Sequence, residues 1–329
     1  MTIPDPQWAE ATRVIDAAER ILLVTHIDPD GDAIGSLLGL TNALRERGKT
    51  VDAAVDGGVP SFMQFLPGSQ TVLQAVMKGE WDVMVSLDAS DEVRTGQCGI
   101  YGRKHSKVVI NVDHHPTNIL FGDIFLVVPE AVATTEILMA WLRDMNQPIT
   151  YPVAVPLLTG LVTDTRGFRT SNVRASTLGE AQRLMEAGAS LTEITLRVLD
   201  SMPYSTLELW KYAMQSVELT GTVVSAAVTQ QDLKRAGIAD ATDGGLVSIL
   251  LQANQAMIAV VYKELANGSV EISLRSKPGF DVAQTAFSLG GGGHKQASGA
   301  TIPGPLEAAR ERVMPMLQQA AKEGALVIA

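Results

Sequence analysis

The chain has 329 residues, of which 46% are hydrophobic and 19% charged, a composition typical of a globular protein long enough for two domains. Its net charge of −10 argues against binding long duplex nucleic acid, because such binding depends on many lysine and arginine contacts with phosphates. A single cysteine, Cys98, excludes an internal disulfide and any zinc site built from several thiolates.

The apolar run 21–25 has the length of a buried strand and ends at a cluster of acids. Beyond it stand His26, Asp28, Asp30 and Asp32. A helical pattern then runs from Ser36 to Arg47. Carboxylates this close repel one another, so the ionised cluster is stable mainly when a cation lies among them. The stretch therefore predicts a divalent metal site, although a solvated turn rich in Asp and Gly would need no ligand.

Two more apolar segments end in the same way. Residues 81–87 form an expected strand that stops at Asp88, and residues 107–112 form another that stops at Asp113-His114-His115. Further strands are expected at 51–55 and 125–128. Strands alternating with helices predict an α/β domain with a doubly wound, mainly parallel sheet. Because the carboxyl ends of parallel strands share one edge, the three sets of ligands are expected to converge there.

Two helical segments follow these strands. Residues 134–145 form one expected helix, and the very apolar residues 152–162 form another that leads to Asp164. Arg166 and Arg169 follow closely, as expected for a further metal ligand beside an anion-binding turn. An aspartate that caps a turn, with both arginines on the surface, explains the same residues equally well.

The second, smaller domain is also expected to be α/β and to cover residues 218–329, after a first domain at 1–190 and a helical linker at 191–217. Asn267-Gly268 between two apolar runs is a strong β-hairpin signal. The expected elements are strands at 222–228, 256–265 and 269–275 and helices at 243–253 and 281–288.

Four consecutive glycines, Gly290 to Gly293, precede His294 and Lys295. Glycines are costly to order, so a fold that keeps four is expected to need backbone N–H groups close to a ligand. Phosphate is the natural ligand, because Arg275, His294 and Lys295 can neutralise it. A flexible glycine hinge is the alternative.

Taken in order, His26-x-x-x-Asp30-x-Asp32, Asp88, Asp113-His114-His115, Asp164 and Gly-Gly-Gly-Gly-His resemble the motifs of the DHH phosphoesterase family. The resemblance covers nearly the whole chain and implies two divalent metal ions, with manganese expected. The implied ligands are His26, Asp30, Asp32, Asp88, His114 and Asp164. One ion would be held by His26 and Asp30, the other by Asp32, His114 and Asp164, with Asp88 as the bridge.

The implied catalytic residues are Asp88, Asp113 and His115. Asp113 would orient His114, because metal-bound imidazoles usually donate their other N–H to a carboxylate or carbonyl. His115 would contact the scissile phosphate and help to protonate the leaving group. Asp28 is expected to lie outside the ligand set.

The resemblance also implies that the second domain binds substrate. The implied substrate-binding residues are His115, Arg275, Gly291, Gly292, Gly293, His294 and Ser298. One departure is Arg166, which stands where relatives commonly have glycine and which bears on specificity.

The implied activity is phosphate ester hydrolysis by a metal-activated water. The implied reactions are cleavage of short RNA oligonucleotides or linear dinucleotides and removal of the 3′-phosphate of 3′-phosphoadenosine 5′-phosphate. A cyclic-dinucleotide phosphodiesterase remains open. A pyrophosphatase agrees less well with the glycine run, and a single-strand exonuclease agrees less well with the chain length. A non-enzymatic nucleotide-binding module would be expected to have lost ligands that this sequence retains.

The expected partner is therefore a small nucleotide or a short oligonucleotide, and a homodimer is left open. No apolar run approaches the roughly 18 residues of a membrane span, and the first residues lack the basic and apolar segments of a signal peptide. We expect a cytoplasmic protein without membrane contact.

Overall fold

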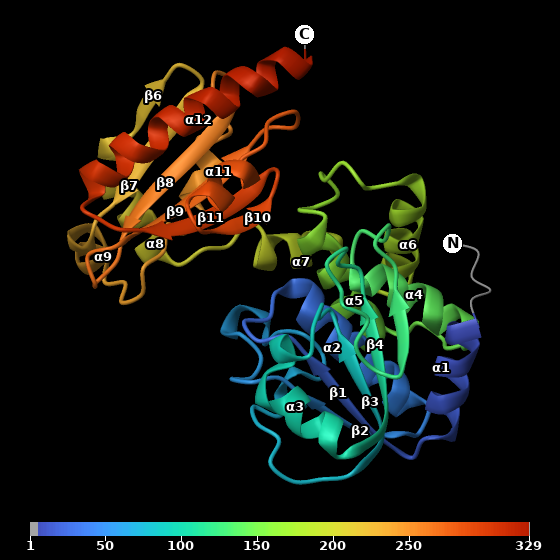
Figure 1. Cartoon of the computed structure of the whole chain (residues 1–329). Helices are drawn as coiled ribbons and strands as arrows, with labels where there is room; N and C mark the ends of the chain where they lie inside the picture. Colours follow the sequence, from blue (N-terminus) through green and yellow to red (C-terminus); the bar gives the residue numbers. More distant parts are fainter. Residues whose placement is uncertain (1–5, 329) are drawn as a thin grey trace. The chain divides into compact units, whose positions relative to one another are not determined.

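The computed structural model describes residues 6–328 and divides into two compact units, with the boundary between Ser201 and Met202 (Figure 1). The expected linker at 191–217 is shared between them. Helix α7 (Leu191–Val198) lies in the first unit, and α8 (Tyr204–Ala213) lies in the second. No helix in the described part of the chain is both long and apolar enough to cross a bilayer.

The first unit is built on a five-stranded sheet with the strand order β2-β1-β3-β4-β5. Its strands are β1 (Arg20–Thr25), β2 (Thr50–Ala54), β3 (Trp81–Leu87), β4 (Ser106–Asp113) and β5 (Ile124–Val127). Every neighbouring pair is parallel, as the alternating pattern predicts. From β1 the chain goes to β2 on one side of the sheet and then to β3, β4 and β5 on the other. The topological switch point therefore lies between β1 and β3, and open α/β sheets bind ligands at such a point.

Helices cover both faces of this sheet. They are α1 (Pro6–Ala17), α2 (Gly31–Glu46), α3 (Gly96–Lys104), α4 (Thr134–Asp144), α5 (Tyr151–Asp164) and α6 (Ala175–Glu186), with α7. Alternate residues of β1 point to opposite faces: Ile21 and Leu23 join the core under α1, α2, α4 and α5, whereas Leu22 and Val24 join a smaller core with Cys98 of α3. The only cysteine is therefore a buried core residue.

Helix α2 begins at Gly31, whereas the periodic pattern predicts a start at Ser36, so the predicted boundary is wrong by one turn. The reason is a cap: the Asp30 carboxylate accepts hydrogen bonds from the backbone N–H groups of Asp32 and Ala33, each at 3.0 Å. The glycines that resemble a turn in the sequence lie inside the helix. Asp32 is thus placed in the first helical turn.

Close packing of α2 on α5 explains these glycines. A Cβ atom on Gly35 would lie 2.5 Å from Pro156 O and 2.9 Å from Gly160 N, and one on Gly31 would lie 2.4 Å from the Thr163 side chain. Only glycine allows the two backbones to approach this closely. The contact fixes the start of α2 beside the end of α5.

The second unit is a six-stranded mixed sheet with the order β10-β11-β9-β8-β7-β6. Its strands are β6 (Glu218–Thr220), β7 (Val223–Val228), β8 (Ile258–Glu264), β9 (Val270–Ser276), β10 (Gly292–His294) and β11 (Ala297–Ile302). Its helices are α8, α9 (Gln230–Ala236), α10 (Leu246–Leu250), α11 (Ala283–Ser288) and α12 (Leu306–Ile328). The predicted Asn267-Gly268 hairpin is confirmed, because β8 and β9 pair antiparallel on either side of it. Helix α10 is shorter than the predicted 243–253.

The two faces of this sheet carry separate cores. Ile258, Val260 and Tyr262 of β8 pack with residues of α11 and α12, and the alternate residues Ala259 and Val261 pack with α8, α9 and α10. Figure 1 shows α12 lying along one face. The second unit is therefore an α/β sandwich with its own core, as the sequence predicts.

The packing of α2 on α5 yields a stability prediction. Gly35→Ala should lower the free energy of unfolding by about 1–3 kcal/mol, because the new methyl group meets backbone atoms that cannot yield. Gly179→Ala in α6 is the matched control, since a Cβ there meets nothing within 4 Å, and it should raise stability by about 1 kcal/mol. Urea unfolding followed by circular dichroism measures both. Equal stability of the two variants would contradict the packing argument.

Candidate metal centre

The six predicted ligands converge in the first unit. Ligand atoms within 4.8 Å of one another form three groups: His26, Asp30 and Asp88; Asp32, His114 and Asp164; and Asp88, His114 and His115. The first two groups match the two ligand sets that the DHH resemblance implies. Asp88 faces both, because its Oδ2 lies 3.7 Å from His26 Nε2 and its Oδ1 lies 3.6 Å from His114 Nε2.

These residues come from the ends of regular elements. His26 follows β1, Asp88 follows β3, and His114 follows β4 at the carboxyl edge of the sheet. Asp30 and Asp32 lie at the start of α2, and Asp164 is the last residue of α5. The convergence predicted from the strand ends is therefore confirmed, and the alternative of an isolated solvated turn fails.

Both histidines present the same ring atom to the carboxylates. His26 Nδ1 lies 2.7 Å from the carbonyl oxygen of Ile27, and His114 Nδ1 lies 3.4 Å from that of Ala131. A carbonyl accepts a hydrogen bond from Nδ1–H, which leaves the Nε2 lone pair free. His114 Nε2 is 3.3 Å from Asp164 Oδ2. This is the arrangement that metal-binding imidazoles need.

The start of α4 supports two of the carboxylates. The backbone N–H groups of Thr134 and Thr135 donate to Asp32 at 2.6 and 3.1 Å, and the Thr134 hydroxyl donates to Asp88 at 2.9 Å. Helix N-termini favour negative charge. The sequence reasoning missed both threonines as site residues. The available signal was their position at the start of a predicted helix.

Asp113 has a different partner from the one expected. Its Oδ1 accepts hydrogen bonds from Nδ1 of His115 at 2.8 Å and from the backbone N–H of His114. It therefore orients the ring of His115 and not that of His114. The reason is spacing, because side chains two residues apart on extended backbone point the same way. Asn118, which the sequence reasoning also missed, donates to the other oxygen of Asp113 at 2.6 Å.

Burial makes this cluster of acids electrostatically costly. Asp32 is fully buried, and this burial, with repulsion from Asp88 and Asp164, raises the pKa of Asp32 well above its usual range. Burial, with repulsion from Asp88 and Asp30, also raises the pKa of Asp164 to about 8. Positive charge among these groups would let them ionise together.

The donor set suits a divalent cation. Four carboxylates and two imidazoles with free Nε2 atoms are the oxygen-rich mixture that Mn²⁺ and related ions bind. No thiolate takes part, since Cys98 lies in the core under α3. The residues present therefore fit a centre that holds divalent metal.

Two positions near the centre have left-handed backbone that favours glycine. Asp88 has φ 56°, and Arg166 has φ 50°. The guanidinium of Arg166 is exposed. Its charge lowers the pKa of Asp164, but burial raises that pKa more strongly. Asp28, also left-handed at φ 53°, is exposed and belongs to none of the three ligand groups, as expected.

In the second unit, strand register aligns part of the predicted substrate set. Arg275 of β9 lies opposite Ala297 of β11, which lies opposite His294 of β10. Residues directly opposite point to the same face, so Arg275 and His294 share one. Ser298 is the next residue after Ala297 on β11, so its side chain points to the opposite face of the sheet. It is buried, and its hydroxyl donates to His294 O at 2.6 Å. The structure therefore does not place the Ser298 side chain beside that of Arg275.

The glycine run has local structural causes. A Cβ on Gly291 would lie 2.1 Å from Gly299 O, and one on Gly293 would lie 2.5 Å from Ala297 O, so β10 can pair with β11 only if both are glycine. Gly290 has φ 82° after the end of α11. A Cβ on Gly292 would approach only the Phe287 ring, at 3.8 Å. The run is therefore a paired strand start and not a flexible hinge.

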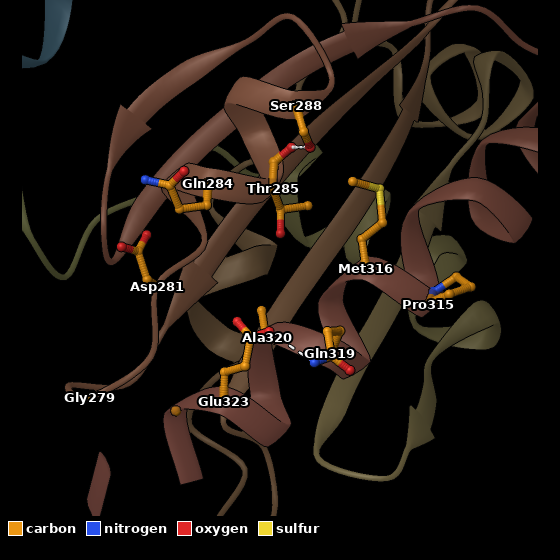
Figure 2. A pocket seen from close by; sticks show the side chains of 11 residues that line it. Gly279, Asp281, Gln284, Thr285, Ser288, Pro315, Met316, Gln319, Ala320 and Glu323 are labelled. Carbon is orange, nitrogen blue, oxygen red and sulfur yellow. Dashed lines mark hydrogen bonds between the residues drawn. The ribbon is translucent and has the colours of Figure 1, made fainter. Parts of the chain in front are cut away.

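A cavity of about 600 Å³ lies between α11 and α12 (Figure 2). Figure 2 shows Gln284 and Thr285 of α11 across from Met316 and Gln319 of α12. Asp281 and Glu323 supply its only charges, since no lysine or arginine is among its lining residues in the described chain. This cavity is unsuited to phosphate, so it is not a candidate for the substrate site.

Comparison with known proteins agrees with this site. Residues 20–161 match the DHH family, N-terminal domain, and residues 221–323 match the DHHA1 domain. A protein of Thermus thermophilus named bifunctional oligoribonuclease and PAP phosphatase NrnA is 34% identical over 325 residues, which cover 96% of each chain. A protein of the same name from Mycoplasma genitalium is 28% identical, over 89% of this chain and 92% of its own.

Among solved structures, an exopolyphosphatase-related protein from Bacteroides fragilis superimposes with a TM-score of 0.88 and is 26% identical, over 98% of both chains. This likeness extends over both units of the fold. With the matches to both domains and the Thermus relative that spans nearly the full length, it shows that the chain belongs to the DHH family of phosphoesterases.

Proposed function

We propose that this chain hydrolyses short RNA oligonucleotides and linear dinucleotides and removes the 3′-phosphate of 3′-phosphoadenosine 5′-phosphate. The observation that carries the proposal is Asp88, whose two oxygens face His26 and His114 in two separate ligand groups. Such a carboxylate is suited to bridge two ions. The names of the Thermus and Mycoplasma relatives indicate the substrates.

Each ligand group would hold one divalent ion, and we propose Mn²⁺. Together the ions would supply a water of lowered pKa and positive charge for the phosphoryl oxygens. His26, Asp30 and Asp88 would hold one, and Asp32, His114 and Asp164 the other. Thr134 and Thr135 would keep Asp32 and Asp88 in place through their hydrogen bonds.

His115 is proposed as the acid of the reaction. Its hydrogen bond with Asp113 is the main cause that raises the pKa of His115 to about 9, so the ring is protonated at neutral pH. A protonated imidazole can contact the phosphate and donate a proton to the leaving oxygen. Asn118 holds Asp113, and Asp113 holds His115, so the acid is kept in one orientation.

Arg275, His294 and the glycines 291–293 of the second unit are proposed to bind the substrate, with Ser298 acting through its hydrogen bond to His294. Cytoplasmic location and a homodimer stay predictions. Turnover of 3′-phosphoadenosine 5′-phosphate, a five-nucleotide RNA, linear and cyclic dinucleotides and pyrophosphate, compared side by side, tests the substrate assignment. Faster cleavage of the cyclic dinucleotide or of pyrophosphate would contradict it.

Asp88→Asn should abolish both proposed reactions, with a loss beyond the roughly 10–100-fold that removal of a group behind a metal ligand costs. Asparagine tolerates the left-handed backbone at this position, so the fold should persist. Asp28→Asn is the matched control, because it makes the same change in the same backbone conformation outside the ligand groups. It should keep activity within a few-fold. Steady-state rates on both substrates decide the matter, and an active Asp88→Asn enzyme would refute the bridging role.

Metal removal should lower stability as well as activity. Protein treated with a chelator should melt at a lower temperature, and added MnCl₂ should restore it, since a ligand at about 100 times its Kd stabilises by about 2.7 kcal/mol. Differential scanning calorimetry of wild type, Asp28→Asn and Asp88→Asn measures the shift. The two chains with intact ligand groups should respond to Mn²⁺, and Asp88→Asn should respond much less. The same response in all three would argue against the assigned ligands.

Arg275→Ala should raise KM for the RNA substrate by about tenfold or more and change kcat little, because a charged hydrogen bond to phosphate contributes about 1.5–3 kcal/mol. Arg312→Ala, which removes an exposed arginine of α12, is the control and should leave KM unchanged. Initial-rate kinetics separates the two constants. An unaltered KM in Arg275→Ala would remove the residue from the substrate site.

A further inference from the structure

A second cavity, of about 500 Å³, lies in the first unit between α4 and α6. Its lining residues recur one helical turn apart: Glu136, Ala140 and Arg143 on α4, and Gly179 and Arg183 on α6. The small residues Ala140 and Gly179 leave the space open. None of its lining residues belongs to the three metal-ligand groups.

Arginine dominates the charge of this cavity. Arg143 and Arg183 share one carboxylate, Glu180, at 2.9 and 3.2 Å, and Arg174 lies 3.5 Å from Glu136. Three guanidinium groups therefore face two carboxylates, which leaves an excess of positive charge in a chain whose net charge is −10. The three arginine side chains are 46–55% exposed, so a ligand can reach them.

We propose that this cavity binds the phosphate group of a nucleotide-sized ligand. Guanidinium groups match phosphate oxygens in pairs, and two that share one carboxylate have donors to spare. The cavity also includes Ser176 in the first turn of α6, and the N-terminal end of a helix favours anions. Its volume lies in the range of small-molecule sites, which exceeds the need of a free phosphate ion.

The cavity and the metal centre share one segment of chain, residues 130–136. Arg174 donates to Glu130 O at 2.9 Å, and Glu136 accepts from the backbone N–H of Val132 at 2.9 Å. The same segment supplies Thr134 and its bonds to the metal-centre carboxylates. An anion that draws Arg174 away from Glu130 would therefore affect the segment whose Thr134 holds Asp32 and Asp88 in place.

Gly179 provides the decisive variant. A Cβ there meets nothing within 4 Å, so Gly179→Leu should fill the cavity without strain and with a gain in helix propensity. Arg183→Gln is a second variant, which removes one cation and leaves Glu180 its bond with Arg143. Arg13→Gln, which removes an exposed arginine of α1 paired with Glu10, is the matched control.

Equilibrium dialysis of the metal-loaded full chain against radiolabelled AMP counts the sites. Gly179→Leu should bind one AMP fewer than wild type, Arg183→Gln should bind that AMP about tenfold more weakly, and Arg13→Gln should match wild type. The test depends only on the difference of one AMP site between wild type and Gly179→Leu. A failure of the proposed hydrolase function would change the total and leave this difference intact. Equal site numbers in wild type and Gly179→Leu would overturn the proposal.

Competitors identify what the cavity recognises. Inorganic phosphate should displace AMP from the site that Gly179→Leu removes, and adenosine should not. Displacement by adenosine but not by phosphate would show recognition of the nucleoside and would also overturn the proposal.

Discussion

Repulsion among buried carboxylates is the constraint on which the rest of this structure depends. Asp32 and Asp88 are almost completely buried. Carboxylate oxygens of Asp32, Asp88 and Asp164 all face Nε2 of the same imidazole, His114. Backbone N–H groups at the start of α4 offset part of this charge at Asp32. Three histidines keep the pKa of Asp88 below its usual value even though burial opposes them. Asp32 and Asp164 have no comparable compensation, so cations are the natural complement of the site.

Rigid elements hold these groups against that repulsion. The strand ends place His26, Asp88 and His114 along one edge, and their spacing is set by the hydrogen bonds of the sheet. The other ligands depend on the contact of α2 with α5, where a Cβ on Gly160 would lie 2.7 Å from Asp32 Oδ1. Glycine at this position therefore serves the ligand geometry as well as the packing of the helices.

The sequence predicted the site better than it predicted how the site is supported. Apolar runs that end in acids are local signals, so β1, β3 and β4 and the convergence of the residues that follow them are predicted correctly, and the role of those residues as metal ligands stays a prediction. The predicted start of α2 is wrong because Gly31 and Gly35 resemble turn residues. Both are glycine because α5 packs closely against them. The bonds from Thr134 to Asp32 and Asp88 join residues 102 and 46 positions apart, so the start of a predicted helix marks Thr134 in the sequence but no local pattern identifies its partners.

The glycine run shows how one motif can have two causes. Its residues suggested a phosphate cradle, yet Gly291 and Gly293 are required by pairing with β11, and Gly290 is required by its left-handed backbone. Cβ atoms on Gly290 and Gly292 would meet no atom closer than 3.8 Å. The backbone N–H groups of Gly290 and Gly291 donate to Phe287 O and Ala286 O, so fewer amides are available to a ligand than the sequence suggests. Side-chain charge, from Arg275 and His294 on a common face, then has to supply more of any affinity for phosphate in this unit.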